Sequence, residues 1–429
     1  MLNRRLSVKG LAAAAVLMSA ALALPAGTWA RPVPNAGPPV PGGVYRDSTD
    51  RGTRVTIRVG PNSDGVIQGT LQVSCARGPA SIHSANGTFV ARGKGFAATG
   101  KFDVDHVTGR ISRTARASRC AAGTFNATLS SPAGVKSTVV RYGPFALNPM
   151  SMSMGMPMSS NMFNMQGSMQ DFFPRNVQKP CSNCYIVAMV PDLVYPNGKV
   201  ANYNTGAMLH HFVIFNTSQR DVTCPKWPQR VFASGNERSD MMVPAGYGYH
   251  IGASDNWNML AELMNMSMQM QNVEVQVTYY YLPASANVRA VTPMWLDENE
   301  CGDSEYSIPA GHSDKVWNYQ VPANGAGDIV AIGGHVHDYG THISLTDTTT
   351  GQMVCNSRAG YGANMAYMKN IDSMSGCTGN PLALIRTGDM LRLDSYYKSP
   401  IAENNVMGIM VAYVDVGAHK SPAAARGKR

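Results

Sequence analysis

The sequence predicts an all-β protein in which a small N-terminal antiparallel β domain precedes two tandem jelly-roll-like β-sandwiches. Short runs of alternating apolar and polar residues recur along the chain, and Gly, Asn, Asp or Pro separates them, as turns between antiparallel strands require. Helical periodicity is rare by comparison. The 429 residues, of which 44% are hydrophobic, are sufficient for several buried cores.

An export signal is predicted at the start of the chain. Residues 1–30 combine a basic beginning, the apolar run "LAAAAVLMSAALAL" and small residues before a cleavage site after Ala30. The paired Arg4 and Arg5 fit either twin-arginine export or ordinary secretion. We therefore expect a secreted or cell-surface protein without a transmembrane segment, since no other run has the roughly 20 apolar residues that a membrane span needs.

The net charge argues against one class of partner. It is +9 for the whole chain and falls to +6 without residues 1–30, which hold three basic residues and no acidic ones. This excess is small for a chain of this length, and no run of lysine or arginine stands out. We therefore expect no nucleic-acid partner.

Three segments precede the main β region. Residues 31–43 form a Pro/Gly-rich leader for which we expect no regular structure, and residues 44–147 form the small β domain, in which no catalytic constellation is apparent. Residues 148–172 form a methionine-rich linker, whose interspersed small polar residues argue against a place in a core. Its thioethers are suited to Cu(I). The methionines that are candidates for copper capture are Met150, Met152, Met154, Met156, Met158, Met162, Met165 and Met169.

Strand patterns resume at residue 173 and continue almost to the end of the chain. Residues 173–290 are assigned to the first sandwich, residues 291–417 to the second, and residues 418–429 to a basic disordered tail. One exception is the run "NWNMLAELMNMSMQMQN" (256–272), whose apolar spacing predicts a helix.

All eight cysteines follow the predicted signal, and an even number of cysteines in an oxidising compartment indicates disulfides. Cys181 and Cys184 form either a tight disulfide or a metal pair, and we favour the disulfide because a zinc site would need a second pair nearby. The other pairs that the grouping along the chain suggests are Cys75–Cys120, Cys224–Cys301 and Cys355–Cys377.

Two histidine motifs point to metal chemistry. In "GGHVHDYGTH", His335 and His337 lie two residues apart, so on a strand both imidazoles project from one face and can chelate copper or zinc. In "LHHFVIF", His210 and His211 are adjacent, so both reach one metal only at a strand end or a distortion. Met407, on a later strand, would add a soft thioether that favours Cu(I) if it lies against His335 and His337.

The segment 306–347, which contains the His-x-His pair, resembles the start of the catalytic half of the copper type II, ascorbate-dependent monooxygenases. These enzymes include peptidylglycine hydroxylating monooxygenase and dopamine β-monooxygenase. The resemblance implies a catalytic copper held by His335, His337 and Met407.

The same resemblance implies a second copper that relays electrons and is held in part by a His-His pair, here His210 and His211. In the monooxygenases a third histidine for this copper lies in a Gln-Val-His-Tyr strand. The matching stretch "VQVTYYYLP" has Thr278 at that position, and a hydroxyl is a poor copper ligand. His250 is the candidate substitute, and the second copper is in doubt.

A wider resemblance, over residues 181–416, is to the plant stress-up-regulated nodulin family and its bacterial relatives. It rests on an ordered series of motifs: "HHFVIFN", "GGHVHDYG", "GQMVCNSRAGYG", "MKNIDSMSGC", "GDMLRLDSYY" and "VMGIMVAYV". The family has no settled reaction, so this resemblance implies a fold and a site without naming a substrate.

Three functions are compatible with these patterns. The first is an exported copper protein of monooxygenase-like architecture that oxidises an unknown small molecule. The second is a non-enzymatic copper sequestering or carrier protein that takes copper from a donor through its methionine-rich segment. The third is a metal-free surface protein. The acidic segment "WLDENECGDSEY" is either a calcium loop or a solvated loop.

Overall fold

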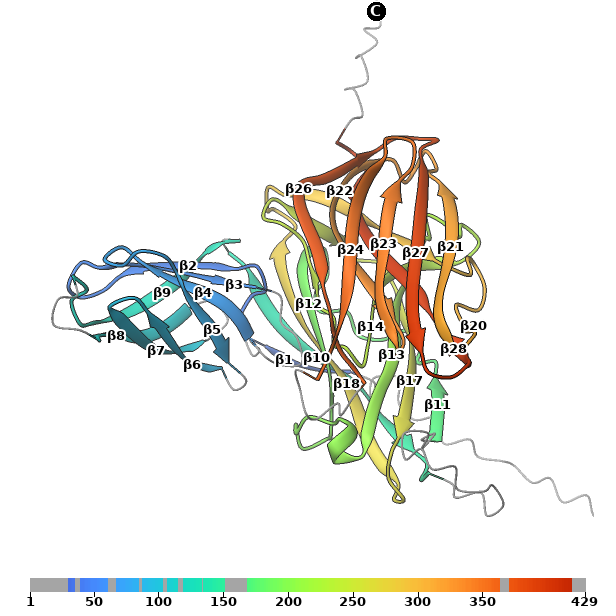
Figure 1. Ribbon diagram of the computed structural model, residues 1–429, viewed down its shortest axis with the longest axis horizontal. Coiled ribbons are helices and arrows are strands. Elements are labelled where there is room, and N and C mark those ends of the chain that lie inside the picture. Colours follow the sequence, from blue (N-terminus) through green and yellow to red (C-terminus); the bar gives the residue numbers. More distant parts are fainter. Residues whose placement is uncertain are drawn as a thin grey trace, which may run out of the picture.

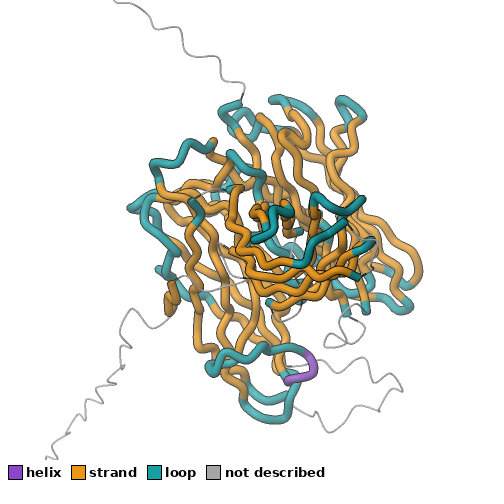
Figure 2. The backbone as a smooth tube through the Cα atoms, turned by 90° about the vertical axis from the view of Figure 1, so that its left-hand side faces the viewer, coloured by secondary structure: helices purple, strands orange, loops and turns teal. Residues whose placement is uncertain are grey.

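Strands dominate the structure, which is a computed structural model. No α-helix occurs among the described residues, whose only regular helix is the 3₁₀ turn η1 (Tyr203–Thr205) (Figure 2). The prediction of an all-β protein is therefore confirmed. No helix among these residues has the length and apolar content that crossing a membrane requires. The structure describes residues 30–34, 39–60, 67–84, 87–102, 106–114, 119–132, 134–150, 168–362 and 370–418.

The N-terminal part is an eight-stranded antiparallel sheet that projects from one side of the molecule, blue in Figure 1. Its order is β5-β4-β3-β2-β9-β8-β7-β6. Alternate residues such as Val55, Ile57 and Val59 of β3 enter one core that all eight strands share, as a period of two predicts. The strands are β2 (Val44–Ser48), β3 (Arg54–Val59), β4 (Ile67–Val73), β5 (Ala80–Ser84), β6 (Thr88–Gly93), β7 (Phe96–Phe102), β8 (His106–Arg113) and β9 (Gly123–Ser131).

A ten-stranded sheet runs through the rest of the molecule in the order β1-β10-β18-β12-β16-β19-β29-β22-β26, and the short β15 pairs with β12. β10 lies within the segment that the sequence assigns to the N-terminal domain, but it pairs with β18. The leader expected to lack regular structure contains most of β1, which pairs with β10. The strands are β1 (Ala30–Pro34), β10 (Lys136–Leu147), β12 (Cys184–Val194), β15 (Met241–Met242), β16 (Tyr247–Ile251), β18 (Gln271–Pro283), β19 (Arg289–Asp297), β22 (Gly327–Val336), β26 (Gly376–Ile385) and β29 (Gly408–Asp415).

The first half of this sheet packs against a four-stranded sheet of order β11-β17-β13-β14. Buried residues of both sheets, among them Phe212, Trp257 and Tyr279, form the largest core of the molecule. The four strands are β11 (Ser168–Phe172), β13 (Ala207–Arg220), β14 (Pro228–Gly235) and β17 (Trp257–Asn265).

The second half of the ten-stranded sheet packs against a five-stranded sheet of order β21-β27-β23-β24-β25 and encloses a second core. A two-stranded sheet of β20 and β28 lies beside it. The molecule is therefore sandwich-like in two places, and one continuous sheet serves both. These strands are β20 (Tyr306–Ile308), β21 (Gly311–Gln320), β23 (Gly340–Asp347), β24 (Gln352–Tyr361), β25 (Ile371–Met374), β27 (Met390–Ser399) and β28 (Glu403–Val406).

The helix predicted over 256–272 is wrong, because this segment forms β17 and the start of β18. In β17 the buried residues alternate strictly, and Trp257, Met259 and Leu263 face the first core. The intervening Leu260 packs on the opposite face of the sheet, against a small cluster beside the second sandwich. Apolar residues on both faces imitate helical spacing in the sequence, and pairing with β11 and β13 decides the strand.

Disulfides reinforce each part of the molecule, and their pairing agrees with the sequence analysis. One of them joins the segment after β13 to the segment after β19 and so ties the first sandwich to the second. The four are Cys75–Cys120, Cys181–Cys184, Cys224–Cys301 and Cys355–Cys377.

Candidate metal centre

The candidate centre lies between the two sandwiches, on sheet faces that point away from both main cores. Val213 of β13, Trp295 of β19, Ile409 of β29 and the adjoining Met407 form a small separate cluster there. Because β13 belongs to the first sandwich and β29 to the second, this cluster packs the outer face of one sandwich against the other.

His335 and His337 stand side by side at the end of β22, as their spacing predicts. Their ring centroids are 5.3 Å apart, and the ring planes are nearly perpendicular. The Nε2 atom of each ring is buried and has no hydrogen-bond partner. A buried polar atom without a partner is costly, so two of them in one place indicate a missing ligand.

The other nitrogen of each ring has a partner that fixes its orientation. His335 Nδ1 lies 3.0 Å from Glu237 Oε1, and His337 Nδ1 lies 2.6 Å from the carbonyl oxygen of Asn405. Carbonyl and carboxylate oxygens only accept, so the proton sits on Nδ1 and the Nε2 lone pair stays free. Histidine ligands of metals are commonly oriented in this way.

The pKa values of these two histidines are shifted in opposite directions. Burial and the neighbouring His210 lower the pKa of His337 well below its ordinary value, so this ring is neutral, as a metal ligand must be. Burial alone would lower the pKa of His335, but the Glu237 carboxylate outweighs it and raises that pKa.

The packing around His335 is close, since a Cβ added at Gly235 would lie 2.9 Å from its Cε1.

His210 and His211 come together through a β-bulge in β13. Leu209 pairs with Leu263 of β17 and His211 pairs with Glu262, so His210 is the extra residue between them. This is the strand distortion that adjacent histidines need in order to face one place. The His210 ring lies 5.1 Å from the His211 ring and 4.8 Å from the His337 ring, so both histidine pairs share one cluster.

Glu262 of β17 completes the first-sandwich side of the cluster. Its Oε2 lies 3.2 Å from His210 Nδ1 and 2.5 Å from His211 Nε2, and the ligand atoms of the three residues lie within 4.8 Å of one another. Burial raises the pKa of Glu262, but the two imidazoles outweigh it and hold that pKa well below its ordinary value. Two nitrogens and an ionised carboxylate form a donor set that suits a transition metal.

Met407 reaches the same region next to β29. Val336 and Gly408 form the last pair of the β22–β29 ladder, so the next position brings the buried Met407 beside His337. The Tyr397 hydroxyl accepts a hydrogen bond from the His337 amide at 2.9 Å and donates one to the Met407 carbonyl. Tyr397 thus holds two segments that carry predicted ligands.

Two residues of the predicted relay site lie elsewhere. His250 is exposed on β16, where its Nε2 lies 3.0 Å from Asn183 Oδ1 and its ring packs against Tyr185. Thr278 is buried in β18, where Val139 and Val190 are its neighbours on the adjacent strands. His250, which was expected to replace the missing third histidine, therefore does not belong to the histidine cluster.

Sequence reasoning missed two acidic residues of this region. Glu237 follows β14 in "ASGNERSD", a stretch without a recognisable motif. Glu262 lies in the segment that was predicted to be a helix. When this segment is treated as a strand and paired with "LHHFVIF", Glu262 lies opposite His211.

Of the predicted copper-capture methionines, Met150 and Met169 are described, and Met169 is exposed on β11. Residues 151–167 of that segment, residues 1–29 of the predicted export signal and residues 419–429 of the basic tail lie outside the described residues.

A cavity of about 600 Å³ opens beside these residues. Its lining draws on both sandwiches, which agrees with its position between them. The members of the centre that line it are His211, Glu237, Glu262, His335 and Met407.

Fold and site together define an all-β protein with a histidine-rich cluster, suited to a transition metal, between two sandwiches. Residues 268–418 match the model of the family Stress up-regulated Nod 19. The matched part contains His335, His337 and Met407 but not His210 or His211. The resemblance to the stress-up-regulated nodulin family is thereby confirmed.

Two fungal proteins are similar over a longer stretch. "Probable copper-dependent oxygenase M1" of Phoma sp. is 27% identical over 297 residues, which cover 65% of this chain and 72% of that protein. "Probable copper-dependent oxygenase clz3" of Cochliobolus lunatus is 28% identical over 252 residues, 53% of this chain and 79% of that protein. The nodulin-like family to which the chain is similar is therefore related to copper oxygenases.

Solved structures add no further argument. The triple jelly roll of an archaeal virus turret assembly aligns with 86% of this chain and 90% of its own at 10% identity, but with a TM-score of only 0.16.

Proposed function

We propose that the protein is an exported copper-dependent oxygenase of a small molecule, with copper held by His335, His337 and Met407. One observation carries the proposal. The Nε2 atoms of His335 and His337 are buried without partners, while Glu237 and Asn405 hold the opposite nitrogens. Two free imidazole nitrogens beside a buried thioether fit Cu(I) better than zinc or magnesium.

Bound copper would supply one-electron chemistry with dioxygen, which protein side chains cannot perform alone. The chain itself orients the two imidazoles, keeps His337 neutral and encloses the site between two sandwiches. Glu237 and Tyr397 act through the ligands, since they touch His335 and the backbone of His337 and Met407.

His210, His211 and Glu262 form a second donor set next to the first. The monooxygenase resemblance implies a separate relay copper whose third histidine is absent here. The 4.8 Å between the His210 and His337 rings and the carboxylate of Glu262 support a different arrangement, in which a second copper would bind beside the first. Thr278 then has no part in metal binding.

A copper carrier is the alternative, and one observation favours it. Met169, at the end of the methionine-rich segment, pairs with Met264 of β17, the strand that also provides Glu262. Asp171 and Phe173, just beyond it, line the cavity. Copper taken up by the methionines would therefore arrive near the histidine cluster.

Metal analysis combined with oxygen consumption in the presence of ascorbate tests the proposal. We expect His335→Ala and Met407→Ala to lower bound copper, and His250→Ala, outside the cluster, to leave it unchanged. Copper-dependent oxygen consumption supports the oxygenase. Binding of more than two coppers without turnover favours the carrier, and unchanged copper in both ligand variants would refute the site.

A further inference from the structure

The cavity between the sandwiches has apolar walls in its deep part. Val213, Phe232, Leu260, Trp295 and Ile409 line it, and all but Leu260 are at least nine-tenths buried. A volume of about 600 Å³ is in the range of cavities that hold a small molecule. A ligand in this part of the cavity would therefore need an apolar body.

The charge of the lining has one sign. Among the described residues that line the cavity, every ionisable side chain apart from histidine and Tyr413 is a carboxylic acid, and neither lysine nor arginine occurs. This is unexpected in a chain with 36 basic and 27 acidic residues. The acidic lining residues are Asp171, Glu237, Asp240, Glu262, Asp303 and Glu305.

Two details indicate that the described residues do not fully balance this negative charge. Glu237 is 1% exposed, yet its Oε2 has no hydrogen-bond partner. Burial raises the pKa of Glu305, and the nearby carboxylates of Glu262 and Asp303 raise it further. A buried oxygen without a partner and carboxylates that repel one another are both relieved by a cation.

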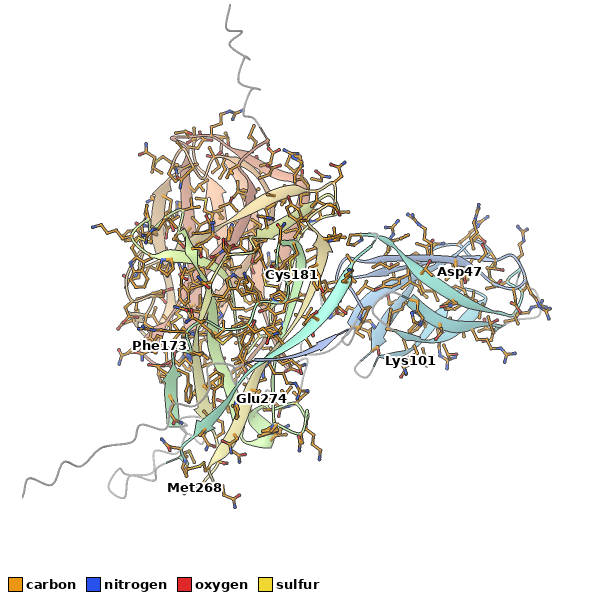
Figure 3. All side chains as sticks on the ribbon, turned by 180° about the vertical axis from the view of Figure 1, so that it is seen from behind. Asp47, Lys101, Phe173, Cys181, Met268 and Glu274 are labelled. Carbon is orange, nitrogen blue, oxygen red and sulfur yellow. A yellow bond between two sulfur atoms is a disulfide. The ribbon has the colours of Figure 1, made fainter. Side chains whose placement is uncertain are left out.

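The cavity is accessible from solvent. Phe173 and Trp227 line it and are 67% and 46% exposed, which marks them as its mouth. Phe173 lies on the side of the body away from the eight-stranded sheet that carries Asp47 and Lys101 (Figure 3). Exposed aromatic rings at an acidic entrance also suit a cationic ligand.

We propose that this cavity binds apolar amines, with the apolar body against the Trp295 wall and the protonated nitrogen among the carboxylates. The inference rests on the proposed function in one respect, since the bound amine is then the molecule presented to the metal centre. The acidic lining also excludes carboxylic acids of similar size, because they would add a like charge to a partly desolvated site.

Binding to the full chain stripped of metal tests this proposal without contribution from copper. The probes are 4-phenylbutylamine, 4-phenylbutanol and 4-phenylbutyrate, which share an apolar body and differ in charge. We expect calorimetry to show the amine binding about tenfold tighter than the alcohol, with the acid weakest. The preference for the amine should decrease as salt is added.

A double variant at the entrance tests the origin of the preference. Asp303→Asn with Glu305→Gln should weaken amine binding about five- to tenfold and leave alcohol binding unchanged. Asp314→Asn is the matched control, because Asp314 is exposed on β21 and does not line the cavity. Equal binding of amine and acid, or unchanged amine binding in the double variant, would overturn the proposal.

Failure of the two proposals is distinguishable. Amine binding by stripped protein that takes up no copper would refute the copper site and leave the cavity assignment intact. Copper uptake without preference for the amine would refute the cavity assignment and leave the copper site intact.

Discussion

Glu298 provides a test of how burial of a carboxyl group affects the stability of this protein. The residue follows β19, is fully buried, and donates its backbone N–H to the Gly408 carbonyl at 2.9 Å, next to Met407. Burial raises the pKa of its carboxyl to about 9, and the nearby Ser395 and Lys315 reduce the effect only in part. The folded protein therefore carries a neutral acid here at neutral pH.

The free energy of unfolding depends on pH because protonation of Glu298 is linked to folding. The folded-state pKa exceeds the unfolded one, so Glu298 contributes stability fully at low pH and loses it as the pH rises towards about 9. The loss reaches about 1.4 kcal/mol per pH unit, or about 4 kcal/mol between pH 5 and pH 8. Glu298→Gln keeps the shape and cannot ionise.

Denaturant unfolding of both proteins at several pH values measures this effect. We expect Glu298→Gln to gain stability over the natural protein by up to about 4 kcal/mol as the pH rises from 5 to 8. Other titrating groups are common to both and cancel. A difference between Glu298→Gln and the natural protein that does not vary with pH would refute the reasoning.

Further predictions concern the centre and its supports. Tyr397→Phe should weaken copper binding about 10- to 100-fold in a chelator competition, whereas Tyr247→Phe, whose hydroxyl meets Asn380 and Arg289 outside the centre, should not. Glu262→Ala should lower the copper content without abolishing it, because the other donor set remains, and metal analysis measures this. Cys224→Ser combined with Cys301→Ser should lower stability by about 4 kcal/mol, measured by denaturant unfolding, since the bond spans 77 residues.

Local patterns in the sequence identify the second-sandwich half of the centre. His335 and His337 share a face because a strand has a period of two, and no distant contact is needed to see it. Met407 follows from the order of motifs. The all-β class likewise follows from alternation that repeats through most of the chain.

The remaining features depend on contacts between distant segments. The bulge at His210 is a property of the pairing between β13 and β17, which the sequence of either strand does not specify. Glu262 becomes a neighbour of His211 only through that pairing. Glu237 meets His335 because the outer faces of the two sandwiches pack together, and no local periodicity encodes that contact.

The position of β10 determines where a fragment that contains only the two sandwiches should begin. It connects the eight-stranded sheet to the rest of the chain and at the same time covers the edge of β18 with paired backbone groups (Figure 1). A sandwich fragment that starts at residue 148 would expose free N–H and C=O groups along the edge of the thirteen-residue strand β18. Such an open edge promotes self-association through strand pairing. A fragment that starts at Lys136 keeps β18 paired, and the edge that it leaves open is that of β10, which β1 covers only over Thr138–Tyr142 in the full chain.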